Sequence, residues 1–205
     1  MNANGTVFLV DDDPTVRESL GRLLQSVNLP YQIFSSAKRF LDAYADNSAS
    51  PGCLVLDVRM PGMSGIELQR KLQKEGIMIP VIFVTGHGDV PMAIDAMKRG
   101  AIDFLEKPFR PQLLLDRIQE ALAQDAERRR AKAERDAVAA RFDRLTARER
   151  KVVDLVTTGM TNKQIAAQFG VSPQAIDANR ARAMTKLQAN SVPGLVRLAL
   201  TSGAA

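Results

Sequence analysis

The chain has 205 residues, of which 45% are hydrophobic and 25% are charged, the composition of a globular protein with one large domain or two small ones. It contains one cysteine, Cys53, and one histidine, His87, so counts alone exclude a disulfide framework and a zinc site built from His and Cys. No run of about 18 apolar residues occurs, and residues 1–10 lack the pattern of a signal peptide, so we expect a cytoplasmic protein with no membrane span.

The net charge of +5 is divided unevenly along the chain. Residues 1–123 carry 13 basic and 15 acidic side chains, a net charge of −2, whereas residues 124–205 carry 15 basic and 8 acidic side chains, a net charge of +7. A slightly acidic half beside a basic half predicts that only the second half binds nucleic acid. Charge by itself leaves open the alternative that the basic half is a solvated surface.

Residues 1–123 alternate short apolar runs with amphipathic stretches. The predicted strands are Thr6–Val10, Tyr31–Phe34, Cys53–Leu56, Val81–Val84 and Asp103–Leu105. The predicted helices are Val16–Val27, Ala37–Tyr44, Ile66–Leu72, Pro91–Arg99 and Pro111–Ala123. Five strands that alternate with helices predict an α/β domain with a doubly wound, five-stranded parallel sheet that is covered on both faces.

The composition changes over residues 124–143, which are rich in Ala, Glu, Arg and Lys and contain no Gly or Pro. These residue types favour helix, and few of them are apolar. The stretch therefore predicts a solvated helical linker that extends the preceding helix. Because acidic and basic residues are interleaved, a spacer is favoured over the alternative of a nucleic-acid-binding arm.

Residues 144–205 predict a small all-α domain. Thr146 to Glu149 and Thr161 to Gln164 have the sequence of a capping box, and Ser172-Pro173 is a typical helix start. The predicted helices are Ala147–Thr158, Asn162–Phe169, Pro173–Leu187 and Pro193–Ser202. The short connection Gly170-Val171-Ser172 between the second and third of these helices is typical of a helix-turn-helix.

Polar residues follow the predicted strands of the first half, namely Asp11, Asp12, Asp13, Asp57, Thr85 and Lys107. In a doubly wound sheet the carboxyl ends of the strands line one crevice, so these side chains are expected to lie together. Carboxylates repel one another unless a cation is present, and Mg²⁺ suits carboxylates, a carbonyl oxygen and phosphate. With Lys107 as a point charge and Thr85 as a hydroxyl donor, the set predicts phosphoryl transfer to a carboxylate.

Four segments of this half resemble the receiver domain of two-component response regulators, and the resemblance covers essentially all of residues 5–123. They are Val10 to Asp12, Leu56 to Gly65, Thr85 to Pro91 and Asp103 to Phe109. The segment from Thr85 is particularly similar to the FixJ-like branch. The resemblance implies a flavodoxin- and CheY-like fold, and it implies that Asp57 accepts a phosphoryl group from a sensor histidine kinase.

The same resemblance implies a metal site. Asp12, Asp57 and the backbone carbonyl of Arg59 would bind Mg²⁺ directly, and Asp11 would act through water. Asp13 falls outside this set.

The resemblance also implies a switch. The hydroxyl of Thr85 would turn toward the phosphoryl group while the ring of Phe104 moves inward, and Lys107 would contact a phosphoryl oxygen. Lys107-Pro108 is a candidate cis peptide, as in the family. His87 is interpreted as an exposed residue of the loop beside the site.

The second half, from Leu145 to about Leu200, resembles the LuxR/NarL-type helix-turn-helix. The matching segments are Leu145 to Glu149, Gly159 to Ala166 and Met184 to Leu187. Apolar side chains on both helices of the motif would be buried, namely Ile165, Ala166, Phe169, Ile176, Met184 and Leu187. Pro173–Leu187 would then be the recognition helix.

Polar and small residues of this motif are candidate DNA contacts. Candidates for base edges are Gln174, Asp177, Ala178, Asn179 and Ala181, and candidates for phosphates are Lys163, Arg180, Arg182 and Lys186. Each could instead be an exposed residue with no contact to DNA. The family often has Thr-Val-Lys-x-His where this chain has Ala175 to Asn179, so Asp177 replaces a lysine and the operator sequence does not carry over from other members.

These features predict a transcription factor rather than an enzyme, apart from its own phosphorylation and dephosphorylation. Phosphorylation of Asp57 by the kinase would promote a homodimer that binds double-stranded promoter DNA and acts on RNA polymerase.

Two alternatives remain open on sequence grounds. Asp11 to Thr15 matches the Asp-x-Asp-x-Thr start of haloacid-dehalogenase-like phosphatases, with Asp11 as nucleophile and Asp13 as general acid. That reading leaves Asp57 without a role and lacks a late acidic pair for the metal. The other alternative is a DNA-binding protein that works without phosphorylation.

Overall fold

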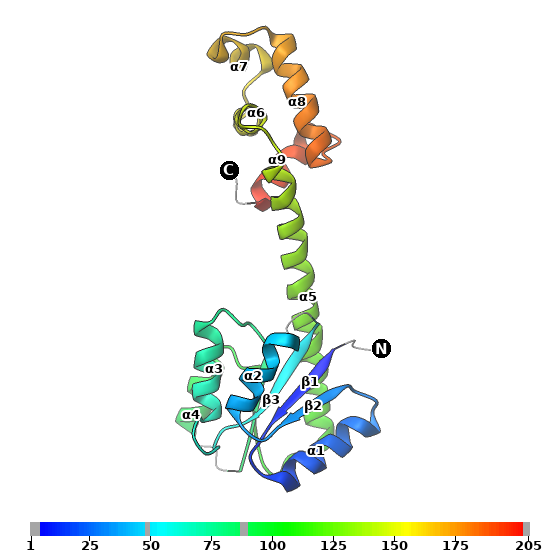
Figure 1. Ribbon diagram of the computed structural model, residues 1–205, viewed down its shortest axis with the longest axis vertical. Helices are drawn as coiled ribbons and strands as arrows, with labels where there is room; N and C mark the ends of the chain where they lie inside the picture. Colours follow the sequence, from blue (N-terminus) through cyan, green and yellow to red (C-terminus); the bar gives the residue numbers. More distant parts are fainter. Residues whose placement is uncertain (1–4, 48–49, 87–89, 203–205) are drawn as a thin grey trace. The chain divides into compact units, whose positions relative to one another are not determined.

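The computed structural model describes residues 5–47, 50–86 and 90–202, which pack into two compact units, Met1–Arg129 and Arg130–Ala205 (Figure 1). His87 lies outside the described residues, so its loop position stays a prediction. Among the helices that the structure describes, none is both long and apolar enough to cross a membrane.

The first unit is built on a five-stranded parallel sheet with the strand order β2-β1-β3-β4-β5. Its strands are β1 (Thr6–Val10), β2 (Tyr31–Phe34), β3 (Gly52–Asp57), β4 (Val81–Thr85) and β5 (Asp103–Glu106). The three central strands are apolar over nearly their whole length, because both faces of a doubly wound sheet are covered. The predicted α/β fold is therefore confirmed, and β3 is one residue longer at each end than the sequence predicts.

Helices cover both faces of this sheet (Figure 1). They are α1 (Pro14–Ser26), α2 (Ala37–Asn47), α3 (Gly65–Lys74), α4 (Val90–Lys98) and α5 (Pro111–Asp143). Phe8 and Val10 of β1 point into a core with α2, α3 and α4, whereas Val7 and Leu9 point into a core with α1 and α5. This two-residue alternation along β1 fixes its register, since a shift by one residue would exchange the two faces.

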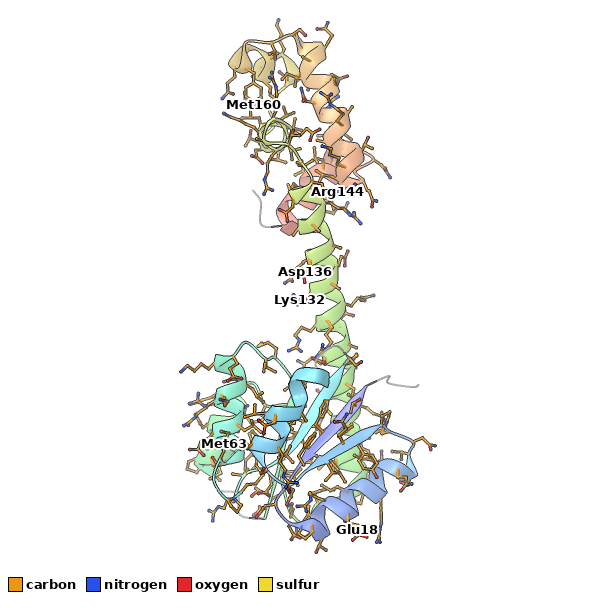
Figure 2. The ribbon with its side chains drawn as sticks, viewed as in Figure 1. Glu18, Met63, Lys132, Asp136, Arg144 and Met160 are labelled. Atoms are coloured by element: carbon orange, nitrogen blue, oxygen red, sulfur yellow. The ribbon has the colours of Figure 1, made fainter. Side chains whose placement is uncertain are left out.

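The helix α5 continues from the first unit into the predicted linker. The linker is solvated in its middle, where Lys132 and Asp136 form an exposed ion pair at 2.6 Å (Figure 2). It is not solvated throughout. Asp125 is fully buried and accepts from the backbone N–H of Gly52 at 3.0 Å, and Phe142 is 2% exposed. The sequence pattern missed these contacts because the buried residues of the linker, Asp125, Val138 and Phe142, are too few and too far apart to produce an apolar stripe.

The second unit is all-α. The end of α5 packs there with α6 (Ala147–Thr157), α7 (Asn162–Phe169), α8 (Pro173–Leu187) and α9 (Val192–Ser202). Both predicted capping boxes are present, on Thr146 with Glu149 and on Thr161 with Gln164. Gly170 ends α7 in the left-handed region, at φ 64°, where glycine has no steric penalty. The predicted helix-turn-helix is thus formed by α7 and α8.

Candidate functional site

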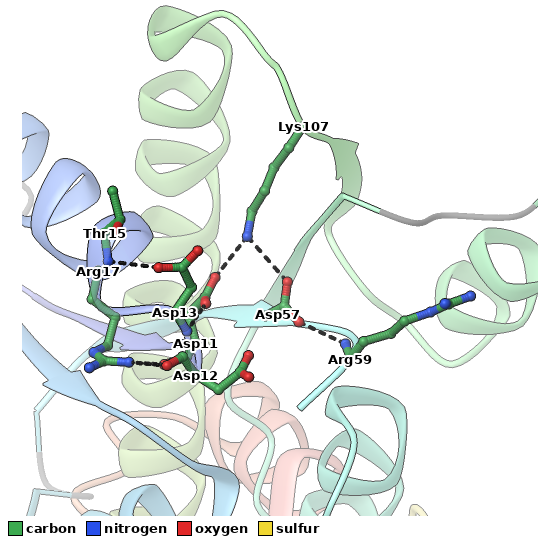
Figure 3. Close-up of polar contacts among 8 residues, drawn as sticks. All are labelled: Asp11, Asp12, Asp13, Thr15, Arg17, Asp57, Arg59 and Lys107. Carbon is green, nitrogen blue, oxygen red and sulfur yellow. Dashed lines mark hydrogen bonds and ion pairs between the residues drawn. The ribbon is translucent and has the colours of Figure 1, made fainter. Parts of the chain in front are cut away.

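The predicted pocket lies at the carboxyl ends of the strands (Figure 3). Asp11 follows β1, Asp57 is the last residue of β3, Thr85 is the last residue of β4, and Lys107 follows β5. The start of α3 presses on this edge, because a Cβ atom at Gly65 would lie 2.2 Å from the carbonyl oxygen of Asp57. A glycine is therefore needed at the point where α3 meets the candidate phosphorylation site.

Lys107 joins the two buried carboxylates of the pocket. Its Nζ lies 2.8 Å from Oδ2 of Asp11 and 3.2 Å from Oδ1 of Asp57 (Figure 3). The side chains of Asp11 and Asp57 are 7% and 9% exposed, and that of Lys107 is 23% exposed. The other oxygen of Asp57 accepts from the backbone N–H of Arg59 at 2.7 Å. The pocket thus fixes Asp57 from both sides and leaves Lys107 open to solvent on one side.

The pKa values in this pocket follow from burial and from the neighbouring charges. Burial, and then the negative charge of Asp11, raise the pKa of Asp57 above its usual value, although Lys107 and the N–H of Arg59 oppose that rise. Burial alone would lower the pKa of Lys107, but its contacts with Asp11 and then with Asp57 outweigh burial and raise that pKa. Lys107 therefore stays protonated while it shares its charge between two carboxylates.

The acidic turn after β1 is held by its own backbone and by α1. The side chain of Asp13 accepts from the N–H of Thr15 at 2.8 Å and caps α1, and this contact lowers the pKa of Asp13. Nη1 of Arg17 donates to the carbonyl oxygens of Asp11 and Asp12, at 2.8 Å and 2.7 Å (Figure 3). The sequence pattern did not identify Arg17, whose contacts with these carbonyls depend on how α1 leaves the turn.

The residues present fit a hard divalent cation only in part. Asp12 is exposed, and it lines a groove of about 740 Å³ together with Arg59 and Pro91. No group of three or more His, Cys, Asp or Glu side chains within the described ranges is placed to hold a metal ion. In the predicted set only Asp12 and Asp57 bind the ion directly through carboxylates, and the backbone carbonyl of Arg59 and water complete it. The donor chemistry therefore suits Mg²⁺, while the ammonium of Lys107 already balances part of the carboxylate charge.

The predicted switch residues lie beside the pocket. Thr85 is 1% exposed, and its backbone carbonyl accepts from the N–H of Lys107 at 2.8 Å. Phe104 is half-buried, with its ring centroid 5.9 Å from that of Phe83. The predicted cis peptide is present between Lys107 and Pro108. The structure thus brings Thr85 and Lys107 to adjacent strand ends, with Phe104 two residues before the end of β5.

In the second unit the apolar residues of the motif form its core as predicted. Ile165, Ala166, Ile176 and Leu187 are at most 2% exposed, and Phe169 and Met184 pack against them. Ala183 is also fully buried. Ala183 was not among the predicted core residues, although it lies seven residues after Ile176 and so on the same face of α8.

The predicted DNA contacts fall into two groups. The side chains of Lys163 and Gln174 are exposed and make no hydrogen bond or ion pair with any described residue, and Ala178 and Ala181 are exposed on α8. The others are engaged. Nδ2 of Asn179 donates to the carbonyl oxygen of Ala175 at 2.7 Å, and Arg182 donates to Oδ1 of Asn179 at 3.2 Å. Asp177 and Arg180 form an ion pair at 2.6 Å.

Lys186, a predicted phosphate contact, forms an ion pair within the second unit. Its Nζ lies 2.6 Å from Oε2 of Glu149, which is 4% exposed in its side chain and also closes the capping box with Thr146. The contact with Lys186, and then that with the backbone N–H of Thr146, lower the pKa of Glu149. Lys186 thus joins α8 to the start of α6, an interaction that spans 37 residues of sequence and that no local pattern signals.

Comparison with protein families gives two separate matches along the chain. Residues 7–119 match the family model described as "Response regulator receiver domain", and residues 143–199 match "Bacterial regulatory proteins, luxR family". The two matches cover the acidic pocket and the helix-turn-helix, respectively.

Similar proteins align over nearly the whole chain. The transcriptional regulatory protein FixJ of Bradyrhizobium diazoefficiens is 43% identical over 203 residues, which cover 99% of this chain and 98% of that protein. The response regulator StyR has a solved structure with a TM-score of 0.88 and 46% identity, covering 96% of this chain and 98% of the other. Full-length FixJ of B. japonicum gives a TM-score of 0.58 and 43% identity, with 98% of each chain covered. These comparisons give no support to the phosphatase alternative.

Proposed function

The chain is a response regulator transcription factor of the FixJ type, and we propose that Asp57 is the residue through which it is switched by phosphorylation. The observation that carries this proposal is the position of Asp57. Its carboxylate is buried at the end of β3, held by the N–H of Arg59 and by Lys107, which also contacts the carboxylate of Asp11. Asp57 also ends the middle strand of the sheet, between the strand that precedes Asp11 and the strand that ends in Thr85.

The chemistry is a transfer from a phosphorylated sensor histidine kinase. An oxygen of Asp57 attacks phosphorus, the bond from phosphorus to the donor breaks, and the donor leaves with its electron pair. Lys107 is close enough to Asp57 to neutralise an oxygen of the incoming group, and the N–H of Arg59 orients the second carboxylate oxygen. Mg²⁺, held by Asp12, Asp57 and the carbonyl of Arg59 with Asp11 acting through water, would supply further charge neutralisation when bound.

The read-out begins at Thr85 and Phe104. A phosphoryl group on Asp57 adds charge next to the buried strand end of β4 and competes for Lys107. We expect the hydroxyl of Thr85 to turn toward that group and the ring of Phe104 to move inward, because both lie on the strands that flank the pocket. The resulting change at the surface of β5 and α4 would favour a homodimer.

The output is promoter binding by the second unit. The exposed residues Lys163 and Gln174 are the best placed to contact DNA, with the lysine suited to phosphate and the glutamine to adenine. Arg182 adds a further exposed charge, whereas Lys186 is held by Glu149. A phosphorylated dimer would place two such units on one promoter and act on RNA polymerase, in the cytoplasm.

The test is phosphorylation followed by intact mass. The full chain is incubated with Mg²⁺ and acetyl phosphate, beside the variants Asp57→Asn, Asp11→Asn and Asp13→Asn. We expect the wild type and Asp13→Asn to gain the mass of one phosphoryl group and Asp57→Asn to gain none. Asp13→Asn is the matched control, since it removes a charge from the same turn but only caps α1. A gain that persists in Asp57→Asn and disappears in Asp11→Asn would contradict the assignment.

A second measurement tests the output. Binding to a promoter duplex is followed by fluorescence anisotropy, together with the molar mass of the protein, before and after phosphorylation. We expect a dimer and tighter binding only in the phosphorylated form. A phosphorylated chain that stays monomeric and binds no more tightly would leave the phosphorylation-independent alternative in its place.

A further inference from the structure

Three polar side chains form a closed network across the helix-turn-helix. Nδ2 of Asn162 donates to Oδ1 of Asp177 at 3.1 Å, and Nη2 of Arg180 donates to the same oxygen at 2.6 Å. Nη1 of Arg180 lies 3.4 Å from Oδ1 of Asn162, a long hydrogen bond. Each of the three residues is therefore joined to the other two.

The backbone positions of this network are set by the fold of the motif. Asn162 is the first residue of α7 and follows the capping residue Thr161, whose side chain accepts from the N–H of Gln164. Asp177 and Arg180 are three residues apart on α8 and so lie on the same face. The network thus connects the start of the first helix to the middle of the recognition helix.

Stability alone is a weak explanation for this network. The side chain of Asp177 is 58% exposed and that of Arg180 is 32% exposed, and ion pairs in such settings add little to the free energy of unfolding. The larger consequence of the network is that it restricts the movement of the Arg180 side chain. A guanidinium has five N–H groups in a rigid plane, and two of them are used here, so its plane is fixed while other donors stay available.

Where the family pattern has a lysine on the helix expected to enter the major groove, this chain has the acidic residue Asp177. Three roles are possible for this residue. It could repel phosphates, accept from the amino group of cytosine, or position Arg180. Oδ1 of Asp177 is already shared by two donors, and its charge is partly balanced by the guanidinium. These contacts favour the positioning role over the other two.

We propose that Asp177 and Asn162 are positioning residues that hold Arg180 for bidentate contact with a guanine edge, so that the three together determine one base of the half-site. The inference deepens the proposed function and rests on promoter binding by this unit. An arginine fork matches O6 and N7 of guanine, and a fork fixed before binding loses less rotamer entropy on binding. Arg180 is then a base-reading residue rather than the phosphate contact expected from the sequence.

The experiment begins with the full-length wild type, phosphorylated by acetyl phosphate. Its preferred site is selected from a randomised DNA duplex library, and Kd is then measured on that duplex and on duplexes with each base pair changed in turn. The same panel is used for Asp177→Asn, Asn162→Ala, their double variant and Arg180→Lys. Asp154→Asn is the matched control, because it removes an exposed acidic charge from the neighbouring helix α6.

We expect Asp177→Asn, Asn162→Ala and Arg180→Lys to lose preference for guanine at one and the same position, each by about ten-fold. The double variant should lose no more than either single variant, since both act through Arg180. Arg180→Lys should keep the salt dependence of binding, because it keeps the charge. Asp154→Asn should keep the preference, and thermal unfolding should show that all the variants are folded.

Two results would overturn the inference. If Asp177→Asn binds every duplex more tightly by the same factor with its base preference unchanged, Asp177 acts by repulsion. If Asp177→Asn changes a position that Asn162→Ala leaves unchanged, Asp177 contacts a base itself. Selection of no sequence by the phosphorylated wild type would instead be a failure of the proposed function, and the two failures are therefore distinguishable.

Discussion

The pocket of the first unit and the surface of α8 each contain an acidic residue paired with a basic one, but in opposite environments. Asp57 and Lys107 are 9% and 23% exposed, whereas Asp177 and Arg180 are 58% and 32% exposed. In the pocket, burial changes the pKa of the carboxyl group and makes each charge sensitive to the next. On α8, solvent screens the charges and the pairing mainly restricts orientation.

This difference suits two different tasks. The covalent change of charge that we propose at Asp57 would have a large effect on its surroundings, because the neighbouring carboxylate and lysine are already in contact there. A DNA-reading surface needs side chains that stay available to a ligand, and it therefore keeps them exposed. Substitutions in the two units can test whether these units are independent and whether burial of the charges makes the difference between them.

The largest expected effect is on the core of the second unit. Phe142 is 2% exposed in a cluster with Val152 and Leu195. Phe142→Ala should reduce the free energy of unfolding of residues 130–205 by about 4 kcal/mol, through lost apolar contact and a cavity. Hydrogen exchange followed by mass spectrometry reports on each unit separately. Equal loss of protection in residues 5–129 would show that the two units do not unfold independently.

The next largest effect concerns Lys107. Lys107→Met keeps the approximate length of the side chain and removes the charge that faces Asp57. We expect the rate of phosphoryl gain from acetyl phosphate to fall about 100-fold, because a preorganised charge at the reacting group is lost. Lys107→Arg keeps the charge, so its rate of phosphoryl gain should fall between those of the wild type and Lys107→Met. An unchanged rate in Lys107→Met would show that Lys107 does not act on the phosphoryl group.

Glu149 tests the ion pair between α6 and α8 in the second unit. Its contacts with Lys186 and with Thr146 lower its pKa, so its contribution to stability is complete above the ordinary carboxyl pKa and is lost as the pH falls through the lowered value. Glu149→Gln should destabilise this unit by about 2 kcal/mol at pH 7 and by less in acid. Gln164→Ala removes the corresponding capping residue of α7, which makes no ion pair, and should therefore show no such pH dependence.

The smallest expected effect is a gain in stability, at Asp57. Because burial and Asp11 raise the pKa of Asp57, the folded protein holds this proton more tightly than the unfolded chain does. The free energy of unfolding therefore falls as the pH rises from the ordinary pKa of an aspartic acid through the raised pKa of Asp57. At pH 7 the ionised carboxylate of Asp57 destabilises the folded unit. Asp57→Asn should therefore stabilise the first unit by about 1 kcal/mol at pH 7 and not below about pH 3.9. Asp42→Asn, at an exposed site, is the control. An equal gain in stability in Asp42→Asn would show that the effect does not come from the buried position of Asp57.

Local sequence was sufficient for most of the elements of this protein. The apolar runs determine the strands, because a parallel sheet buried on both faces needs nearly continuous apolar residues. The caps at Thr146, Thr161 and Ser172 determine where the helices of the second unit begin, since each satisfies backbone N–H groups within three residues. The acidic residues could also be placed at one edge of the sheet, because topology alone brings the strand ends together.

Tertiary structure decided which of these charges contact one another. Lys107 is separated by 96 residues from Asp11, and Lys186 by 37 residues from Glu149. Arg17 reaches the carbonyls of the acidic turn, and Asp125 reaches the N–H of Gly52 across 73 residues. Such contacts depend on side-chain directions between elements that are distant in sequence, whereas strands and caps depend on neighbours. The residue types therefore came from the sequence, and their partners came from the packing of the folded chain.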